Sequence, residues 1–112
     1  MKALFVELPA FERHRSNYLS DEAYRGLQNE MLKDPEAGDV IAGTGGLRKV
    51  RHGDATRGKG KRGGLRIIYY WWEPQKQFWL FTLYDKDELG DLSPKEKAIL
   101  KTLLKQELEE RK

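Results

Sequence analysis

The sequence contains no cysteine, and it has few of the other residues on which common enzyme sites depend. The absence of thiols excludes disulfide bonds, thiol nucleophiles and cysteine-ligated zinc, and it fits a reducing compartment. The two histidines, His14 and His52, lie outside any HExxH spacing, so no histidine zinc site is predicted. No GxSxG motif is present, so a serine hydrolase site is not predicted either.

Long hydrophobic runs are also missing. The apolar run within residues 1–7 is far too short for a signal peptide or a membrane span. We therefore predict a cytoplasmic protein with no membrane partner. A chain of 112 residues can form one modest core, so residues 1–112 are predicted to be a single domain.

Acidic residues are scarce in one part of the chain, and positive charge is concentrated there. Residues 47–66 hold eight basic residues and one acid, Asp54, whereas the whole chain carries a net charge of only +3. The remainder is therefore net acidic. A cationic surface on such a domain indicates a polyanionic partner, most commonly nucleic acid. A solvated basic loop without a partner is the alternative.

Patterns of apolar residues predict a strand and two helices in the first third of the chain. The strand is expected within residues 3–8, and the first helix across the segment that contains Phe11 and Tyr18. Ser20 is a suitable N-cap for a second helix, which is predicted to end before Pro35. The apolar stripe of this second helix is Tyr24, Leu27, Met31 and Leu32.

Three strands are predicted in the middle of the chain. They are residues 47–51, 64–72 and 78–86, with a turn at 73–76. Alternation along the first of them places Lys49 and Arg51 on one face. In the last strand, alternation groups Phe78, Leu80, Thr82, Tyr84 and Lys86 on one face. The two long strands are apolar on both faces, so we expect both faces of the sheet to be covered.

A helix is predicted at the C-terminus. Ser93, Pro94 and Glu96 form the pattern of a capping box with proline at the first helical position. The predicted buried stripe is Ile99, Leu100, Leu103, Leu104 and Leu108, which packs on the chain's own sheet or on a partner. The predicted fold is α+β, with the order β-α-α-β-β-β-α and a twisted, antiparallel-rich sheet packed by the N-terminal helices and a C-terminal helix.

The strands supply cations and tyrosines that suit RNA cleavage. RNA carries its own nucleophile, the 2′-hydroxyl, so cleavage needs a proton acceptor, cations around the phosphorane and a donor for the 5′ oxygen. Lys49, Arg51 and Arg66 are predicted to hold the phosphate, with Tyr84 and Lys86 reaching in from the neighbouring strand. Crowding by cations lowers the pKa of a lysine, which makes Lys49 or Lys86 a candidate base.

An acidic cluster follows the last predicted strand. It consists of Asp85, Asp87, Glu88 and Asp91. Carboxylates of this kind can hold Mg²⁺, but Lys86 lies inside the cluster and repels a cation, so a polar turn is the preferred interpretation. We predict no metal site and no cofactor.

Four segments together resemble a known family. The segments 38–51, 58–70, 83–88 and 91–93 resemble the RelE/ParE toxin superfamily, most closely its HigB-like branch, and the similarity spans almost the whole chain. The resemblance implies a RelE-like fold and the toxin of a type II toxin-antitoxin system. That toxin is a ribosome-dependent, metal-independent mRNA endonuclease, or mRNA interferase, that inhibits translation.

The resemblance also implies which residues act. The paired cations of the family fall on Lys49 and Arg51, its phosphate-binding arginine falls on Arg66, and the residues that close the site fall near Tyr84 and Lys86. A loop over residues 56–64 is expected to contact RNA or rRNA. The expected RNA-binding residues are Arg48, Arg57, Lys59, Lys61, Arg62 and Tyr70.

The partners implied are the ribosome with its mRNA and a cognate antitoxin. The antitoxin is expected to be a HigA-like helix-turn-helix protein, so that operator DNA is bound only through the toxin-antitoxin complex. Two alternatives remain at this point: a ParE-type gyrase inhibitor that cleaves nothing, and a non-catalytic RNA-binding module of the same fold.

Overall fold

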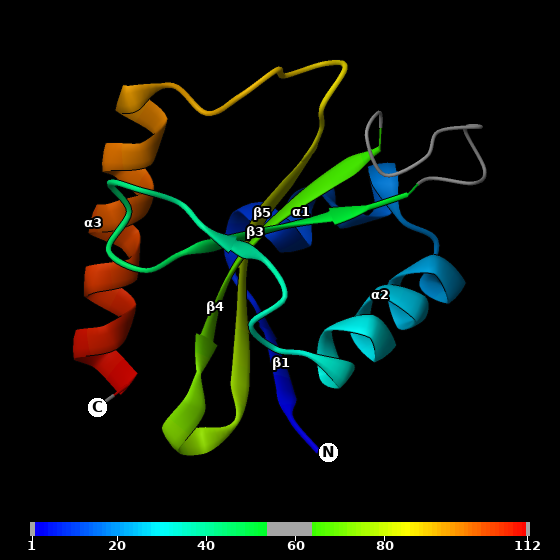
Figure 1. The fold of residues 1–112 in the computed structure, drawn as a ribbon, viewed down its shortest axis with the longest axis horizontal. Coiled ribbons are helices and arrows are strands. Elements are labelled where there is room, and N and C mark those ends of the chain that lie inside the picture. The colour runs from blue at the N-terminus through cyan, green and yellow to red at the C-terminus, as the bar shows by residue number, and fades with distance from the viewer. Residues whose placement is uncertain (1, 54–63, 112) are drawn as a thin grey trace.

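The computed structural model describes residues 2–53 and 64–111, and strands of this part of the chain form one sheet with helices on both faces (Figure 1). The strands are β1 (Leu4–Glu7), β2 (Asp39–Val40), β3 (Arg48–His52), β4 (Leu65–Trp72) and β5 (Gln77–Asp85). Their order across the sheet is β1-β5-β4-β3-β2. β1 runs parallel to β5, and the other neighbouring strands are antiparallel.

The predicted α+β order is confirmed. The helices are α1 (Pro9–Tyr18), α2 (Asp21–Lys33) and α3 (Pro94–Arg111). The two-residue strand β2 is an addition, which lies in the connection between α2 and β3. A short 3-10 helix, Glu73–Gln75, forms the predicted turn between β4 and β5.

No helix in the described part of the chain is long and apolar enough to cross a membrane.

Helices α1 and α2 cover one face of the sheet. Ser20 caps α2 as predicted, because its hydroxyl accepts a hydrogen bond from the Ala23 N–H at 3.1 Å. The predicted apolar stripe of α2 faces the sheet, and its residues Tyr24, Leu27 and Met31 are buried. The core on this side joins these side chains to Phe11, Leu19, Leu65, Ile67, Tyr69, Phe78, Leu80 and Leu83.

Helix α3 covers the opposite face. Its predicted capping box is confirmed, since the Ser93 N–H donates to Glu96 Oε1 at 2.9 Å and the Glu96 N–H donates to Ser93 Oγ at 3.1 Å. Its buried side chains pack in a core of Leu8, Leu47, Ile68, Trp79, Phe81, Tyr84, Leu92, Leu100 and Leu104. Both faces of the sheet are therefore covered, as expected from the two apolar faces of β4 and β5.

The predicted buried stripe of α3 is too wide. Ile99 and Leu103 are 51% and 43% exposed, whereas Leu100 and Leu104 are buried. Leu108 lies four residues further and is half-buried against the same core. A helix lying on a sheet buries one row with four-residue spacing, and residues one position away are rotated by about 100° towards solvent.

A β-bulge in β5 overturns the predicted grouping of its side chains. The pairing with β4 shifts between Ile68 and Tyr69, so Ile68 is opposite Thr82 while Tyr69 is opposite Leu80. Because the extra residue reverses the alternation, Leu80 faces α1 and α2, whereas Tyr84 faces α3. The prediction that Leu80 and Tyr84 share a face is therefore wrong.

Candidate functional site

A row of polar side chains crosses three adjacent strands on the face covered by α3. Arg51 of β3 is opposite Arg66 of β4, and Arg66 is opposite Tyr84 of β5. Directly opposed residues of neighbouring strands share a face, with their Cβ atoms about 5 Å apart. The structure thus brings together three of the five residues that were predicted to be catalytic.

Two arginines face each other in this row, which is electrostatically unfavourable. Like charges on directly opposed positions destabilise a sheet. Arg66 is only 3% exposed, and its Nη1 donates to the carbonyl oxygens of Leu65 at 3.2 Å and Gly64 at 3.4 Å. Arg51 is exposed. Positions that break a local rule of stability are typical of functional sites, and arginine side chains on one face of a sheet suit an anion.

Tyr84 completes the row and is buried. Burial raises the pKa of its phenol above the ordinary value, and the carboxylates of Asp91 and Glu96 raise it further, while Arg66 acts in the opposite direction. The hydroxyl therefore keeps its proton over the whole physiological range. A protonated phenol beside an arginine pair can donate a hydrogen bond or a proton to a bound anion.

Lys49 lies two residues before Arg51 on the same strand, so it extends the cationic face along β3. Its Nζ is 3.8 Å from Oδ1 of Asp91, in the loop before α3. Lys49, Arg51 and Asp91 line one hollow, together with Lys97 from the first turns of α3. Lys49 and Asp91 therefore form an ion pair between β3 and the loop before α3.

Lys86 lies two positions beyond Tyr84 along the chain. It follows β5 directly, its side chain is exposed, and its backbone N–H donates to the Gly64 carbonyl at 3.2 Å. The adjacent Asp85 is fully buried, and its Oδ1 accepts a hydrogen bond from the Asp87 N–H at 2.7 Å. Within the described residues, no group of three or more acidic, histidine or cysteine side chains is arranged to hold a metal ion.

The predicted RNA-binding residues are distributed differently. Arg48 lies on the other face of β3, where its guanidinium donates to the carbonyl of Gly38 at 2.8 Å and pairs with Glu36 at 3.0 Å. This geometry separates Arg48 from Lys49 and Arg51 and does not support an RNA contact. Tyr70 lies on the face of Arg66, where it is half-buried against Trp79 at 5.3 Å between ring centroids. The expected contacts Arg57, Lys59, Lys61 and Arg62 lie outside the described residues.

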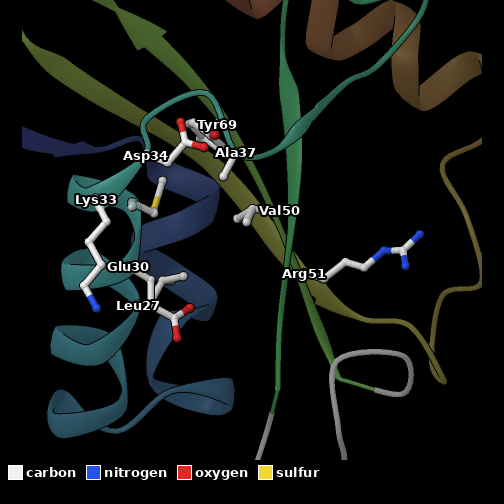
Figure 2. A pocket seen from close by; sticks show the side chains of 9 residues that line it. Leu27, Glu30, Lys33, Asp34, Ala37, Val50, Arg51 and Tyr69 are labelled. Carbon is white, nitrogen blue, oxygen red and sulfur yellow. The ribbon is translucent and has the colours of Figure 1, made fainter.

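A pocket on the opposite face is distinct from this site. It measures about 230 Å³, lies between α2, β3 and β4, and includes Leu27, Met31 and Val50. Figure 2 shows Val50 pointing toward α2, whereas the guanidinium of Arg51 points away to the other side of the strand. The charged end of Arg51 therefore belongs to the face of α3.

Sequence reasoning missed two residues at this site, Asp91 and Lys97. Asp91 was interpreted as part of a polar turn, and Lys97 lies in a helix that was expected only to pack. The signal for Asp91 was its position in an acidic cluster just beyond Tyr84, but no periodicity connects that loop to β3. The contact between them depends on the tertiary path of the chain from β5 to α3 (Figure 1).

These features define a small α+β protein with a cationic row on the sheet face that carries its C-terminal helix, and solved structures share its fold. A mutant of the E. coli toxin RelE in the free state matches with a TM-score of 0.53, covering 88% of this chain and 96% of that chain at 15% identity. The intact E. coli RelBE toxin-antitoxin complex contains a chain that matches with a TM-score of 0.52, covering 75% of this chain and 96% of that chain at 13% identity.

The chain thus shares the fold of the E. coli toxin RelE. No protein-family model matches the sequence.

Proposed function

We propose that this protein is the toxin of a type II toxin-antitoxin system, of the HigB-like branch, and that it is a ribosome-dependent endonuclease of mRNA. The observation that carries the proposal is the row of Arg51, Arg66 and Tyr84 on one face, extended by Lys49. The likeness to the E. coli toxin RelE supports the proposal at the level of the fold. The four sequence segments that resemble the HigB-like branch support the finer assignment.

The chemistry is a transfer of the phosphodiester to the 2′ oxygen. The 2′ oxygen loses its proton and attacks phosphorus, the bond from phosphorus to the 5′ oxygen breaks, and the 5′ oxygen takes up a proton. Arg51 and Arg66 stabilise the negative charge that develops on the phosphorane oxygens. Tyr84 donates the proton to the leaving oxygen, which its retained proton allows.

Lys86 is the better of the two lysine candidates for the proton acceptor. The Nζ of Lys49 forms an ion pair with Asp91 at 3.8 Å, and an anion can take the place of that carboxylate. We therefore assign phosphate binding to Lys49. Lys86 is exposed and follows β5 directly, two positions after Tyr84.

The proposed partners are the ribosome with its mRNA and a helix-turn-helix antitoxin of the HigA type. The matching RelBE structure is a toxin-antitoxin complex, which supports an antitoxin partner for this chain. We expect operator DNA to be bound only through the toxin-antitoxin complex.

Expression of an Arg51→Gln variant tests the proposed function. The Arg51 side chain is exposed, so the variant keeps the fold but loses one cation of the row. We expect growth arrest to be relieved and the codon-phased 5′ ends of translated mRNA, mapped by primer extension, to disappear. Lys33→Gln is the matched control, because it removes the same charge from an exposed position at the end of α2 on the other face.

Two outcomes would contradict the nuclease. An Arg51→Gln protein as toxic and as active in mRNA cleavage as the parent would show that the row is not the site. DNA damage signalling with intact mRNA after expression of the parent would instead identify a ParE-type gyrase inhibitor.

A further inference from the structure

A hollow of about 220 Å³ lies beside the proposed catalytic row. Its walls come from β2 and the residues that follow it, from β3, from the loop before α3 and from α3 itself. Its charged lining consists of Asp39, Lys49, Arg51, Asp91 and Lys97. Three cations from two separate elements therefore line one small depression.

Asp91 neutralises part of this charge in the free protein. Its Oδ1 lies 3.8 Å from Lys49 Nζ and also accepts a hydrogen bond from the Leu92 N–H at 3.0 Å. The Asp91 side chain is 76% exposed, and ion pairs at such exposure contribute little to stability. A bound anion can therefore take the place of this carboxylate on Lys49 at small cost.

Lys97 occupies a position that its helix does not favour. It lies near the N-terminus of α3, where the helix dipole disfavours a positive charge. The neighbouring acid that would offset this charge, Glu96, is engaged in the capping box with Ser93. Lys97 is half-buried and lines the hollow.

We propose that this hollow is a second phosphate subsite for single-stranded RNA, in which Lys49 and Lys97 bind the phosphodiester next to the scissile one and displace Asp91. The proposal rests on the function proposed above. Lys49 and Arg51 are two positions apart along β3, which corresponds to a distance of about 7 Å. Neighbouring phosphates of one strand have a similar spacing, so consecutive phosphates fit the subsite and the row.

A short oligoribonucleotide with 2′-O-methyl groups tests the subsite, because it retains every phosphate but lacks the attacking hydroxyl. Binding to the full chain is measured by titration at several salt concentrations. Lys97→Gln should weaken binding severalfold and reduce the slope of log K against log salt by about 0.7, the value for one phosphate contact to a single strand. Lys95→Gln is the control, since Lys95 lies in the same turn of α3 but is exposed and outside the hollow.

The charge of Asp91 provides the second, opposite test. Asp91→Asn keeps an oxygen for the Leu92 N–H but removes the competitor from Lys49, so it should bind the oligonucleotide severalfold more tightly than the parent. Glu88→Gln removes the same charge from an exposed position of the same loop and should have a smaller effect. The subsite is refuted if Lys97→Gln matches Lys95→Gln, if Asp91→Asn binds no more tightly than Glu88→Gln, or if the parent does not bind the oligonucleotide.

These outcomes are separable from those of the nuclease. Loss of codon-phased mRNA ends in the Arg51→Gln variant, with no difference between Lys97→Gln and Lys95→Gln, would leave the proposed function standing without the subsite. Salt-dependent binding through Lys97 by a protein that cleaves no mRNA would leave the subsite standing without the nuclease.

Discussion

At the scale of single residues, the site depends on side chains that are unusually placed for a protein surface. Arg66 is buried between two strands and faces another arginine, and Tyr84 is buried with a raised pKa. Each of these placements costs stability in isolation, because buried polar groups lose hydration and like charges repel. Hydrogen bonds from Arg66 to the carbonyl oxygens of Gly64 and Leu65 offset part of this cost.

Replacement of Tyr84 by phenylalanine isolates the role of its hydroxyl. The aromatic ring remains in the core, so the free energy of unfolding should change by about 1 kcal/mol or less. Loss of a proton donor should slow cleavage by about 10² to 10⁴ in single-turnover reactions on programmed ribosomes. A Tyr84→Phe protein that cleaves at the parental rate would assign proton donation to another group.

The cations of the row could be predicted from the sequence, and their neighbours could not. Lys49, Arg51 and Arg66 lie on strands whose alternation fixes the face of each side chain, and their placement follows from adjacent positions. Asp91 and Lys97 reach the same site from a loop and a helix. Their approach depends on how α3 crosses the sheet, and no local pattern encodes that crossing.

At the scale of elements, helix α3 places some of its apolar residues in the core and leaves others exposed to solvent. Leu104 is 2% exposed in the core, whereas Ile99 is 51% exposed. We expect Leu104→Ala to reduce the free energy of unfolding by about 2–5 kcal/mol, because it leaves a cavity against the sheet. Ile99→Ala should change it by about 0.5 kcal/mol or less. Urea denaturation measures both, and equal losses would contradict the packing of α3 described here.

The ends of helices were more predictable than the faces they bury. Ser20 and the pair of Ser93 and Glu96 cap their helices as the sequence indicated, because capping is decided by residues a few positions apart. The bulge in β5 was not predictable in this way. No glycine or proline marks it within the run from Phe78 to Leu83, and pairing with β4 decides where the extra residue is accommodated.

At the scale of the whole molecule, three buried tyrosines link stability to alkaline pH. Burial raises the pKa of Tyr24, Tyr69 and Tyr84 above the ordinary value of about 10, and for Tyr24 the carboxylate of Glu7 raises it further. Above pH 10 the unfolded chain loses these protons while the folded chain keeps them. The contribution of these groups is therefore complete below pH 10, and it is lost as the pH rises through the folded-state values.

The urea concentration at the midpoint of unfolding should accordingly decrease as the pH is raised from about 10 to about 11.5. Tyr24→Phe removes one of the three groups and should flatten this decline by up to about 1.4 kcal/mol per pH unit. A variant whose stability falls as steeply as that of the parent would show that the ionisation of Tyr24 is not linked to unfolding.

The parallel pairing of β1 with β5 affects when the sheet can form during synthesis of the chain. Leu4 pairs with Gln77, so β1 has no partner in the sheet until β5 has been synthesised. Tyr84 follows later still, and α3 can pack on the sheet only after its own residues have been synthesised. Contacts of such long sequence separation form slowly. The row of Arg51, Arg66 and Tyr84 can therefore assemble only after β5 has been synthesised.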